Sequence, residues 1–542
     1  MSTVERLATF VAETRLDRIP VAVLERARLQ AVSAVAAARA GVLEPGVRKV
    51  CSHLRDRPGP VRLLATGTPV SLHAAVVGNA TASCAFDWDE ILLLAHPSHS
   101  AVGVAWALGE AHDHTLGEVL AAQVIASELS GRLGLACFFG PQNGQHQPFL
   151  HHLGGAAAAA RLLGLRADAT ADALSIALAQ PQTALWPAFV GAIESKALTA
   201  AHPAEQGLSA AEHAAAGVRG PRHVLDHPRG FFHRFTFLPA PRALTGLGRT
   251  WLLHTLQVKE HAACWYFQAP VDALLRLRSE ADPPLDPTTV RRIQARVTLL
   301  GSAVHGLARQ TASAASLLPN TVNFRLDYSL GLALLHGALH PAVMTEPRLR
   351  ADQEALRRLA AVTRVTHDVE HSRATVAAVH AALDVPALLD AGPLAVATAL
   401  GRARREFSGL GGLGAGELVP LSGELWRAAR QLATRRHDSR STAPYDLGRD
   451  DIAEAVQTLT LPCGATVTLE LADGRSRTAR VDVPGGAIRD PAAGRAVLER
   501  KLRVALAATE PGREREAEAI LSGFLDAPLH TPVRTVLDRL HG

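Results

Sequence analysis

The first 250 residues carry the spacing of buried helices almost throughout, and nothing in them alternates long enough to predict a strand. Ser2 followed by Glu5 fits a capping box, and apolar residues then follow at helical spacing. Pro20 suits the first turn of the next helix. A run of small residues over 154–160 permits close packing of helices. Residues 1–250 are therefore predicted to form a large, all-helical domain.

The pattern changes near Trp251. Residues 293–299 alternate apolar and polar side chains, which is typical of a half-buried strand. Two further alternating runs, over 467–471 and 479–483, flank an Asp473-Gly474 pair and predict a hairpin. Helical stretches lie between these strands, so the chain from 251 to 490 is predicted to be α+β.

Two other regions complete this division of the chain. Residues 376–455 contain two helical stretches on either side of a Gly-rich segment and a polar run, so we interpret them as an irregular insertion. Residues 491–542 return to a helical pattern up to the last residue.

Charge and composition argue against several classes of protein. The net charge is +5, the charges are scattered, and aromatic residues make up 4% of the chain, so nucleic acid is not expected as a partner. The sequence contains no run of about 18 apolar residues, so no membrane span is predicted. The five cysteines are widely spaced without a CxxC pair, and the first turns are charged rather than apolar. These features predict a cytoplasmic protein with reduced thiols.

Two motifs match known patterns without the context that those patterns need. Residues 409–414 (Gly-Leu-Gly-Gly-Leu-Gly) fit GxGxxG, but no strand precedes them and no helix opens after them, so a loop is predicted. His146, His151 and His152, or the acidic residues within 87–90, suggest metal ligands. Their spacing matches no known metal site, so no metal is predicted.

Four segments combine small residues with a polar group and an ionisable side chain that is unusual in its surroundings. They cover residues 78–98 with Asp87 and His96, 144–165 with His146, 194–207 with Lys196, and 323–328 with Tyr328. The chain has four lysines, at 49, 196, 259 and 501, while arginine supplies almost all of its positive charge. Lys196 lies among Ala and Leu, which favours a site residue over a solvated surface lysine.

Together with the stretch 228–232, Val258-Lys259 and the late hairpin, these segments resemble the MmgE/PrpD family. Its members include 2-methylcitrate dehydratase, cis-aconitate decarboxylase and iminodisuccinate epimerase. The resemblance covers most of the chain outside 376–455. It implies a large helical domain built from both chain ends and a smaller α+β lid domain. It also implies a homodimer without a cofactor, acting on a small carboxylate.

The resemblance transfers five site positions to this chain: Asp87, His96, His146, Lys196 and Tyr328. Lys196 and His146 are expected to bind substrate carboxylates. His96, oriented by Asp87, is expected to act as base or acid, and Tyr328 to give a proton or hydrogen bond to the departing group. Elimination next to a carboxylate needs such a set of cations, base and acid.

Each position also has a structural alternative. The histidines can be satisfied core residues, Asp87 a helix cap, and Tyr328 core filling. Asp89 and Glu90 are interpreted as possible surface members of the acidic cluster.

Two departures from the family pattern bear on the substrate. Ile91 stands where the family has a threonine, and Gln268 stands where it has a histidine nine residues after the lysine at 259. Both positions are predicted to contact substrate. Losing a hydroxyl and an imidazole makes the pocket more apolar and less suited to citrate-like polyanions.

The leading functional prediction is therefore a dehydratase or decarboxylase, a lyase without a cofactor, with a non-citrate substrate in specialised metabolism. An isomerase, epimerase or cyclase that uses the same acid and base is the alternative. A non-catalytic member of the family is the third possibility.

Overall fold

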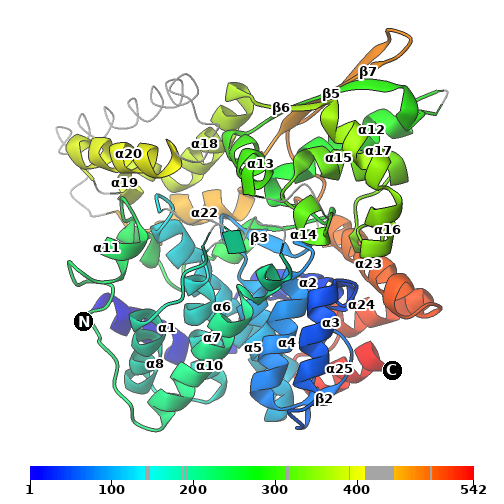
Figure 1. Ribbon diagram of the computed structural model, residues 1–542. Coiled ribbons are helices and arrows are strands. Elements are labelled where there is room, and N and C mark those ends of the chain that lie inside the picture. The colour runs from blue at the N-terminus through cyan, green and yellow to red at the C-terminus, as the bar shows by residue number, and fades with distance from the viewer. Residues whose placement is uncertain are drawn as a thin grey trace.

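The computed structural model describes residues 1–140, 147–185, 187–188, 193–282, 284–311, 317–389, 391–408, 445–488 and 491–542. Helices pack into a broad body, seen in the lower half of Figure 1, and a small sheet with its own helices lies above it. The predicted fold class, mostly helical with a smaller α+β part, is confirmed.

The body begins with helices from the first half of the chain. They are α1 (Thr3–Glu13), α2 (Val21–Gly41), α3 (Pro45–Leu54), α4 (Leu72–Cys84), α5 (Ser98–Ala111), α6 (Leu116–Ala136), α7 (Phe149–Leu162), α8 (Ala167–Ala179), α10 (Ala201–Ala215) and the short α11 (Phe231–Phe235). The capping box predicted at the start of α1 is confirmed: Glu5 N donates to Ser2 Oγ (3.2 Å), and Ser2 N donates to Glu5 Oε2 (2.6 Å).

Small residues allow α7 and α10 to pack closely, as the run over 154–160 predicts. A Cβ added at Gly207 of α10 would lie 2.6 Å from the carbonyl oxygen of His152, and one at Gly155 of α7 would lie 2.6 Å from that of Ala204. Both distances are shorter than van der Waals contact allows, so these positions require glycine.

The last helices of the chain pack against the first ones. These helices are α23 (Pro491–Thr509), α24 (Ala517–Leu525) and α25 (Val533–His541). α23 and α24 contact α2, while α25 contacts α5 and α6. Both chain ends therefore lie in the helical body, and the boundaries at 250 and 490 stay predictions.

The main sheet has the strand order β6-β5-β7-β8. Its strands are β5 (Val290–Val297), β6 (Thr363–His367), β7 (Ala465–Leu471) and β8 (Ser476–Val481). β5 is parallel to β6 and antiparallel to β7, and β7 and β8 form the predicted hairpin around Gly474, whose φ is 87°. The parallel strand β6 is an addition to the sequence prediction.

Helices of the α+β part pack on and beside this sheet. They are α12 (Gln268–Ser279), α13 (Leu299–Thr311), α14 (Pro319–Val322), α15 (Leu326–His336), α16 (Glu346–Ala351) and α17 (Gln353–Ala361). α12 lies against β7 and β8, and α15 contacts β6 and α17.

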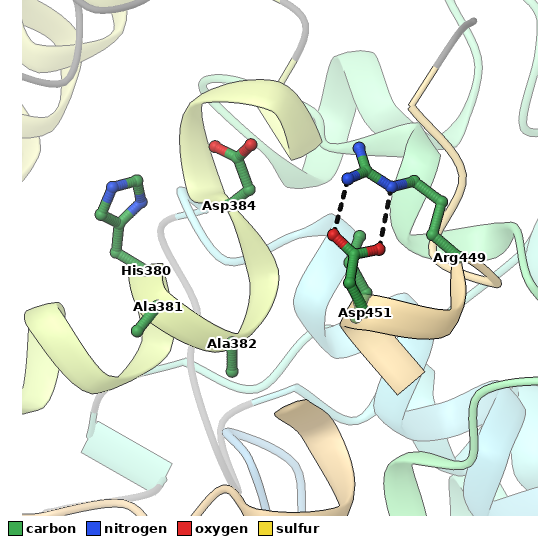
Figure 2. Close-up of a pocket in the computed structure, with 7 residues that line it drawn as sticks. His380, Ala381, Ala382, Asp384, Arg449 and Asp451 are labelled. Atoms are coloured by element: carbon green, nitrogen blue, oxygen red, sulfur yellow. Dashed lines mark hydrogen bonds and ion pairs between the residues drawn. The ribbon is translucent and has the colours of Figure 1, made fainter. Parts of the chain in front are cut away.

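The predicted insertion over 376–455 covers the second half of α18 (Val369–Leu383), all of α19 (Val385–Leu389) and α20 (Pro393–Ser408), and the first part of α22 (Asp450–Thr458). The GxGxxG match at 409–414 lies outside the described residues. A cavity of about 330 Å³ opens between the end of α18 and the start of α22 (Figure 2). Beside it, Arg449 donates to the Asp451 carboxylate through Nε (3.1 Å) and Nη2 (2.6 Å). None of the predicted site residues lines this cavity.

In the parts of the chain that the structure describes, no helix is both long enough and apolar enough to span a bilayer.

Candidate active site

Two short strands bring distant parts of the chain together at the predicted site. β3 (Glu90–Leu92) pairs antiparallel with β4 (Leu256–Val258), and Glu90 stands opposite Val258. One residue further along, Lys259 N donates to Asp89 O (3.1 Å). This register places the side chains of Asp89 and Lys259 side by side, because directly opposite residues of an antiparallel pair are neighbours.

The resulting ion cluster is fully inside the protein. Lys259 Nζ donates to Asp87 Oδ1 (2.8 Å) and to Asp89 Oδ1 (2.7 Å), and all three side chains are at most 2% exposed. Burial alone would lower the pKa of Lys259, but the two carboxylates raise it above its ordinary value. Lys259 is therefore a permanent ammonium that balances part of the acidic charge.

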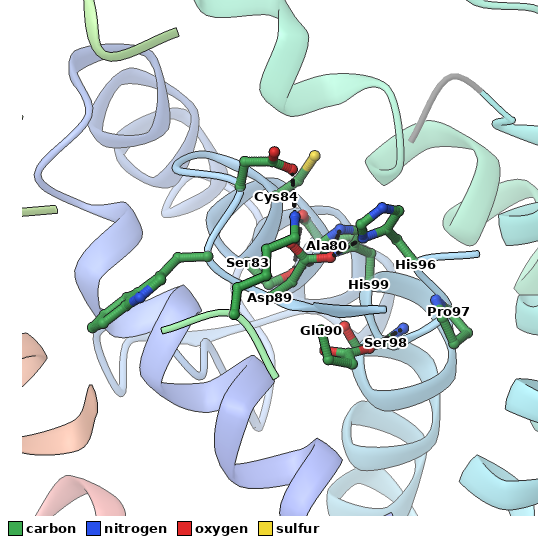
Figure 3. A network of polar contacts seen from close by, with 12 residues as sticks. Ala80, Ser83, Cys84, Asp89, Glu90, His96, Pro97, Ser98 and His99 are labelled. Carbon is green, nitrogen blue, oxygen red and sulfur yellow. Dashed lines mark hydrogen bonds and ion pairs between the residues drawn. The ribbon is translucent and has the colours of Figure 1, made fainter. Parts of the chain in front are cut away.

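The second oxygen of Asp89 faces two imidazoles (Figure 3). His96 Nδ1 lies 2.6 Å from Asp89 Oδ2, and His99 Nε2 lies 3.4 Å from the same oxygen. Burial favours a higher pKa for Asp89, yet Lys259 and the two histidines bring it well below its ordinary value. Asp89 is thus a carboxylate at neutral pH, and His96 donates its Nδ1 proton to it.

This geometry corrects the expected partner of His96. Asp89, rather than Asp87, orients the imidazole, because Asp87 adopts a left-handed backbone (φ 54°) and its carboxylate is bound by Lys259. The interpretation of Asp89 and Glu90 as surface members of the cluster is also wrong, since neither is exposed.

A second buried network lies behind the first. Glu90 Oε1 accepts hydrogen bonds from Ser98 N (3.1 Å) and Gln30 Nε2 (3.3 Å). Burial, together with the negative charge of Asp89, raises the pKa of Glu90 to about 7. Burial lowers the pKa of Lys501, the nearby lysine of α23, to about 7.

Lys196 occupies a short 3₁₀ helix, η3 (Glu194–Leu198), and is not exposed at all. Its Nζ donates to Cys84 O (3.4 Å) and lies 4.8 Å from the centre of the Phe324 ring. Among the described residues, no carboxylate comes within 4 Å of this ammonium. A buried cation held by a carbonyl and an aromatic face leaves its charge available to an anion.

Cys84 shows how close Lys196 comes to the acidic residues. Burial raises the pKa of its thiol to about 11, and the charges of Lys196, Asp89 and Asp87 all act on it. The structure therefore gathers Asp87, His96 and Lys196 around the end of α4. The Cys84 thiol stays protonated at neutral pH and is not a nucleophile.

Tyr328 lies in the first turn of α15, four residues after Phe324. The Arg325 guanidinium lies 4.4 Å from the centre of its ring and forms a two-fold ion pair with Asp327 (2.9 and 2.6 Å). Asn323 Nδ2 donates to Ala85 O (3.3 Å). This bond ties the segment to the turn over residues 85–90, which carries Asp87, Asp89 and Glu90 and is called the acidic turn below.

The two departures from the family pattern have different surroundings. Gln268 Oε1 accepts from His261 N (2.9 Å), and its Nε2 donates to the carbonyls of His261 (3.0 Å) and Ala263 (3.2 Å). The amide is occupied by its own loop, which does not favour the predicted contact with substrate. Ile91 is buried in β3, and strand alternation places it on the same face as Asp89.

The predicted carboxylate-binding residue His146 lies outside the described residues. The neighbouring His151 and His152 are buried, and burial lowers the pKa of His151 well below its usual value and that of His152 to about 4. Within the described ranges, no three His, Cys, Asp or Glu side chains are grouped as a metal site would require.

The structure adds Lys259, Asp89, His99 and Lys501 to this region. The scarcity of lysine was the available signal, since three of the four lysines are buried beside the acidic turn or near it. Sequence alone gave no means of pairing Lys259 with Asp89, because 170 residues separate them.

Comparison with known proteins shows what the first half of the chain is similar to. Residues 5–242 match the MmgE/PrpD N-terminal domain. The chain is 28% identical over 283 residues to a cis-aconitate decarboxylase of Aspergillus terreus (strain NIH 2624 / FGSC A1156), covering 48% of this chain and 57% of that protein. A second cis-aconitate decarboxylase of Aspergillus terreus is 27% identical over 299 residues, covering 51% and 60%.

This match confirms the predicted resemblance to the MmgE/PrpD family over residues 5–242. The matched stretch spans less than two thirds of the length of either relative.

Proposed function

We propose that this protein is a lyase that eliminates water or carbon dioxide next to a carboxylate by general acid–base catalysis, without a cofactor. The observation that carries the proposal is a buried Asp89–His96 pair beyond the end of α4, the helix whose last residue, Cys84, accepts a hydrogen bond from Lys196. Among the described residues, the Lys196 ammonium has no acidic partner within 4 Å. An oriented imidazole supplies the base, and the unpaired cation supplies the carboxylate-binding group.

The hydrogen bonds of His96 determine which of its nitrogens can accept a proton from the substrate. Asp89 holds the Nδ1 proton of His96, which leaves the Nε2 lone pair free to remove a carbon-bound proton. In a dehydration, the electron pair of that C–H bond forms the double bond as the C–O bond breaks. The leaving hydroxide then takes a proton, and Tyr328 is the proposed donor.

Lys196 is proposed to bind the carboxylate next to the reacting carbon. Negative charge spreads onto this carboxylate as the proton leaves, so a fixed ammonium in a water-poor site stabilises the transition state more than the ground state. His146 is proposed as a further carboxylate-binding residue.

The surroundings of the site favour a substrate with less charge than a citrate. Lys259 is neutralised by two aspartates, the Gln268 amide is satisfied by backbone, and Ile91 is apolar. His99 carries no charge at neutral pH, because burial lowers its pKa. Of the cations described around the acidic turn, Lys196 is therefore the one we propose for substrate binding.

A turnover assay by mass spectrometry tests the proposal. Wild type and Lys196→Met would be incubated with crotonate- and 3-hydroxybutyrate-type monocarboxylates, with 2-methylcitrate and cis-aconitate, and with extract of the source cells. A Lys196-dependent loss of water or carbon dioxide supports a lyase. Efficient turnover of 2-methylcitrate or cis-aconitate would contradict the reduced charge that we propose for the substrate.

The alternatives predict other outcomes of the same assay. An isomerase, epimerase or cyclase converts substrate without changing its mass, because the same base and acid only move a proton or close a ring. No Lys196-dependent change on any substrate favours a non-catalytic member of the family. A homodimer is proposed as the assembly, and light scattering of the purified protein measures it.

A further inference from the structure

Lys501 reaches from the C-terminal helix α23 into the turn that carries Asp87 and Asp89. Its Nζ donates to Trp88 O (2.6 Å) and to Ser33 Oγ of α2 (3.0 Å), and it lies 4.8 Å from the centre of the Trp88 ring. Lys501 is 2% exposed. Its backbone contact is thus with the one residue between the two aspartates.

Trp88 is fixed from its other end as well. Its indole Nε1 donates to Glu260 O (2.8 Å), one residue after Lys259. Two distant segments therefore bind residue 88 directly: α23 through Lys501, and the chain just after β4 through Glu260. Lys501 also joins this point to α2 through Ser33.

The backbone of this turn needs such support. Asp87 has a φ of 54°, a conformation that side chains other than glycine rarely adopt and that persists where the surrounding structure over-determines it. The next residues present Asp89 to His96 at 2.6 Å and Glu90 to Ser98. A shift of the Trp88 carbonyl would move the carboxylates of Asp87 and Asp89, because these two residues flank Trp88 in the sequence.

A purely structural lysine is the alternative. Such a residue is usually an ion-pair partner or extends its ammonium to water. Lys501 does neither: no carboxylate lies within 4 Å of its Nζ in the described part of the chain, and its ammonium is buried. Burial lowers the pKa of Lys501 to about 7, and in either protonation state its buried Nζ gives its hydrogen bonds to Trp88 O and Ser33 Oγ. Burying such a group is costly without those bonds, so they fix the side chain on the Trp88 carbonyl.

We propose that Lys501 is a positioning residue of the active site, which holds the turn at Trp88 so that Asp89 orients His96. It acts through that turn and does not touch substrate. The role in turnover rests on the proposed function, whereas the holding of the turn does not.

The first measurement is independent of any substrate. Lys501→Met keeps the length of the side chain but removes its donors. We expect faster hydrogen–deuterium exchange in peptides that cover residues 85–95, together with a change in the ¹⁵N ring resonances of His96. Leu502→Ala is the matched control, since it removes buried packing at the next residue of the same helix but no hydrogen-bond donor. It is expected to lower overall stability and to leave both local signals as in wild type.

The second measurement is kinetic. Once a substrate is known, Lys501→Met is expected to lower kcat about 10- to 100-fold, in line with the effect of misplacing a catalytic group by an ångström, with little change in KM. The double variant with Asp89→Asn is expected to lose little beyond Asp89→Asn alone, because both changes act on one contact.

The outcomes separate this inference from the proposed function. Unchanged exchange over 85–95 and unchanged His96 resonances in Lys501→Met overturn it, with or without turnover. A kcat equal to that of wild type in folded Lys501→Met also overturns it. If Lys501→Met does not fold, Ser33→Ala is the second variant, because it removes one of the two hydrogen bonds that hold the Lys501 Nζ. The same changes in exchange and in the His96 resonances are then expected, at smaller size. A wild type inactive on all substrates contradicts only the proposed function.

Discussion

Replacing Asp89 by asparagine distinguishes the role of its carboxylate from that of Asp87 in the same turn. The new Oδ1 still accepts the Lys259 hydrogen bond, but the amide Nδ2 now faces the Nδ1 proton of His96, two donors at a distance of 2.6 Å. The imidazole must turn away or change its tautomer. A lost hydrogen bond to a charged group costs about 2–3 kcal/mol of unfolding free energy. Turnover is expected to fall about 100- to 10,000-fold, the usual contribution of an oriented acid or base.

Asp87→Asn is the matched comparison. It also removes one negative charge from Lys259, and asparagine tolerates the left-handed backbone at this position (φ 54°). The Asp89–His96 contact stays in place. A similar loss of stability is therefore expected, with a much smaller loss of turnover than in Asp89→Asn.

Urea unfolding and kcat on the same preparations distinguish the two variants, and the ¹⁵N resonances of the His96 ring report its tautomer without a substrate. If Asp87→Asn lowers kcat as much as Asp89→Asn while both are folded, the assignment of Asp89 as the residue that orients His96 is refuted.

Three further predictions follow from the same contacts. Lys196→Met is expected to raise KM for a carboxylate substrate about 100-fold, because it removes the protein's partner in a buried charge pair with the substrate. Lys49→Met, at the exposed lysine, is the control and should leave KM unchanged. Equal KM values in the two variants would contradict the prediction. Burial raises the pKa of Glu90 from 4.5 to about 7, so unfolding releases a proton and stability falls as pH rises through this window. Glu90→Gln should remove this fall, on the order of 2–3 kcal/mol, in urea titrations at pH 5 and pH 8; parallel curves would argue against it. Gln268→Ala leaves three backbone groups of 261–263 without partners and should cost about 1–3 kcal/mol without raising KM, whereas a rise in KM would restore its predicted contact with substrate.

Local patterns predicted the elements of the fold well. The capping box at Ser2, the close helix packing at Gly155 and the hairpin around Gly474 each depend on residues near in sequence, so they are visible without a structure. The strand β6 was not visible in this way. Its residues are half-buried rather than alternating, and its pairing with β5 is parallel and distant.

The site was predictable in part. Asp87, His96 and Lys196 stood out as ionisable residues among small or apolar ones, and the structure gathers them around the end of α4. The partner of His96 was not predictable, since Asp87 and Asp89 both lie within ten residues of it and the backbone at 87 decides which one faces it. The surroundings of Gln268 depend on the loop at 261–263, which carries no local signal.

The strand pair β3–β4 has a consequence for how the chain reaches its native state. Asp87 and Asp89 are synthesised 172 and 170 residues before Lys259, and Ser33 is made 468 residues before Lys501. Until Lys259 emerges from the ribosome, the carboxylates of Asp87 and Asp89 lack the ammonium that binds both of them. Burying them before that point carries a large cost in solvation. The helices of the first half have local contacts and form early, but this region must stay open to water through most of translation. Closing such long loops is slow, so we expect the acidic turn to be among the last regions to become protected during folding.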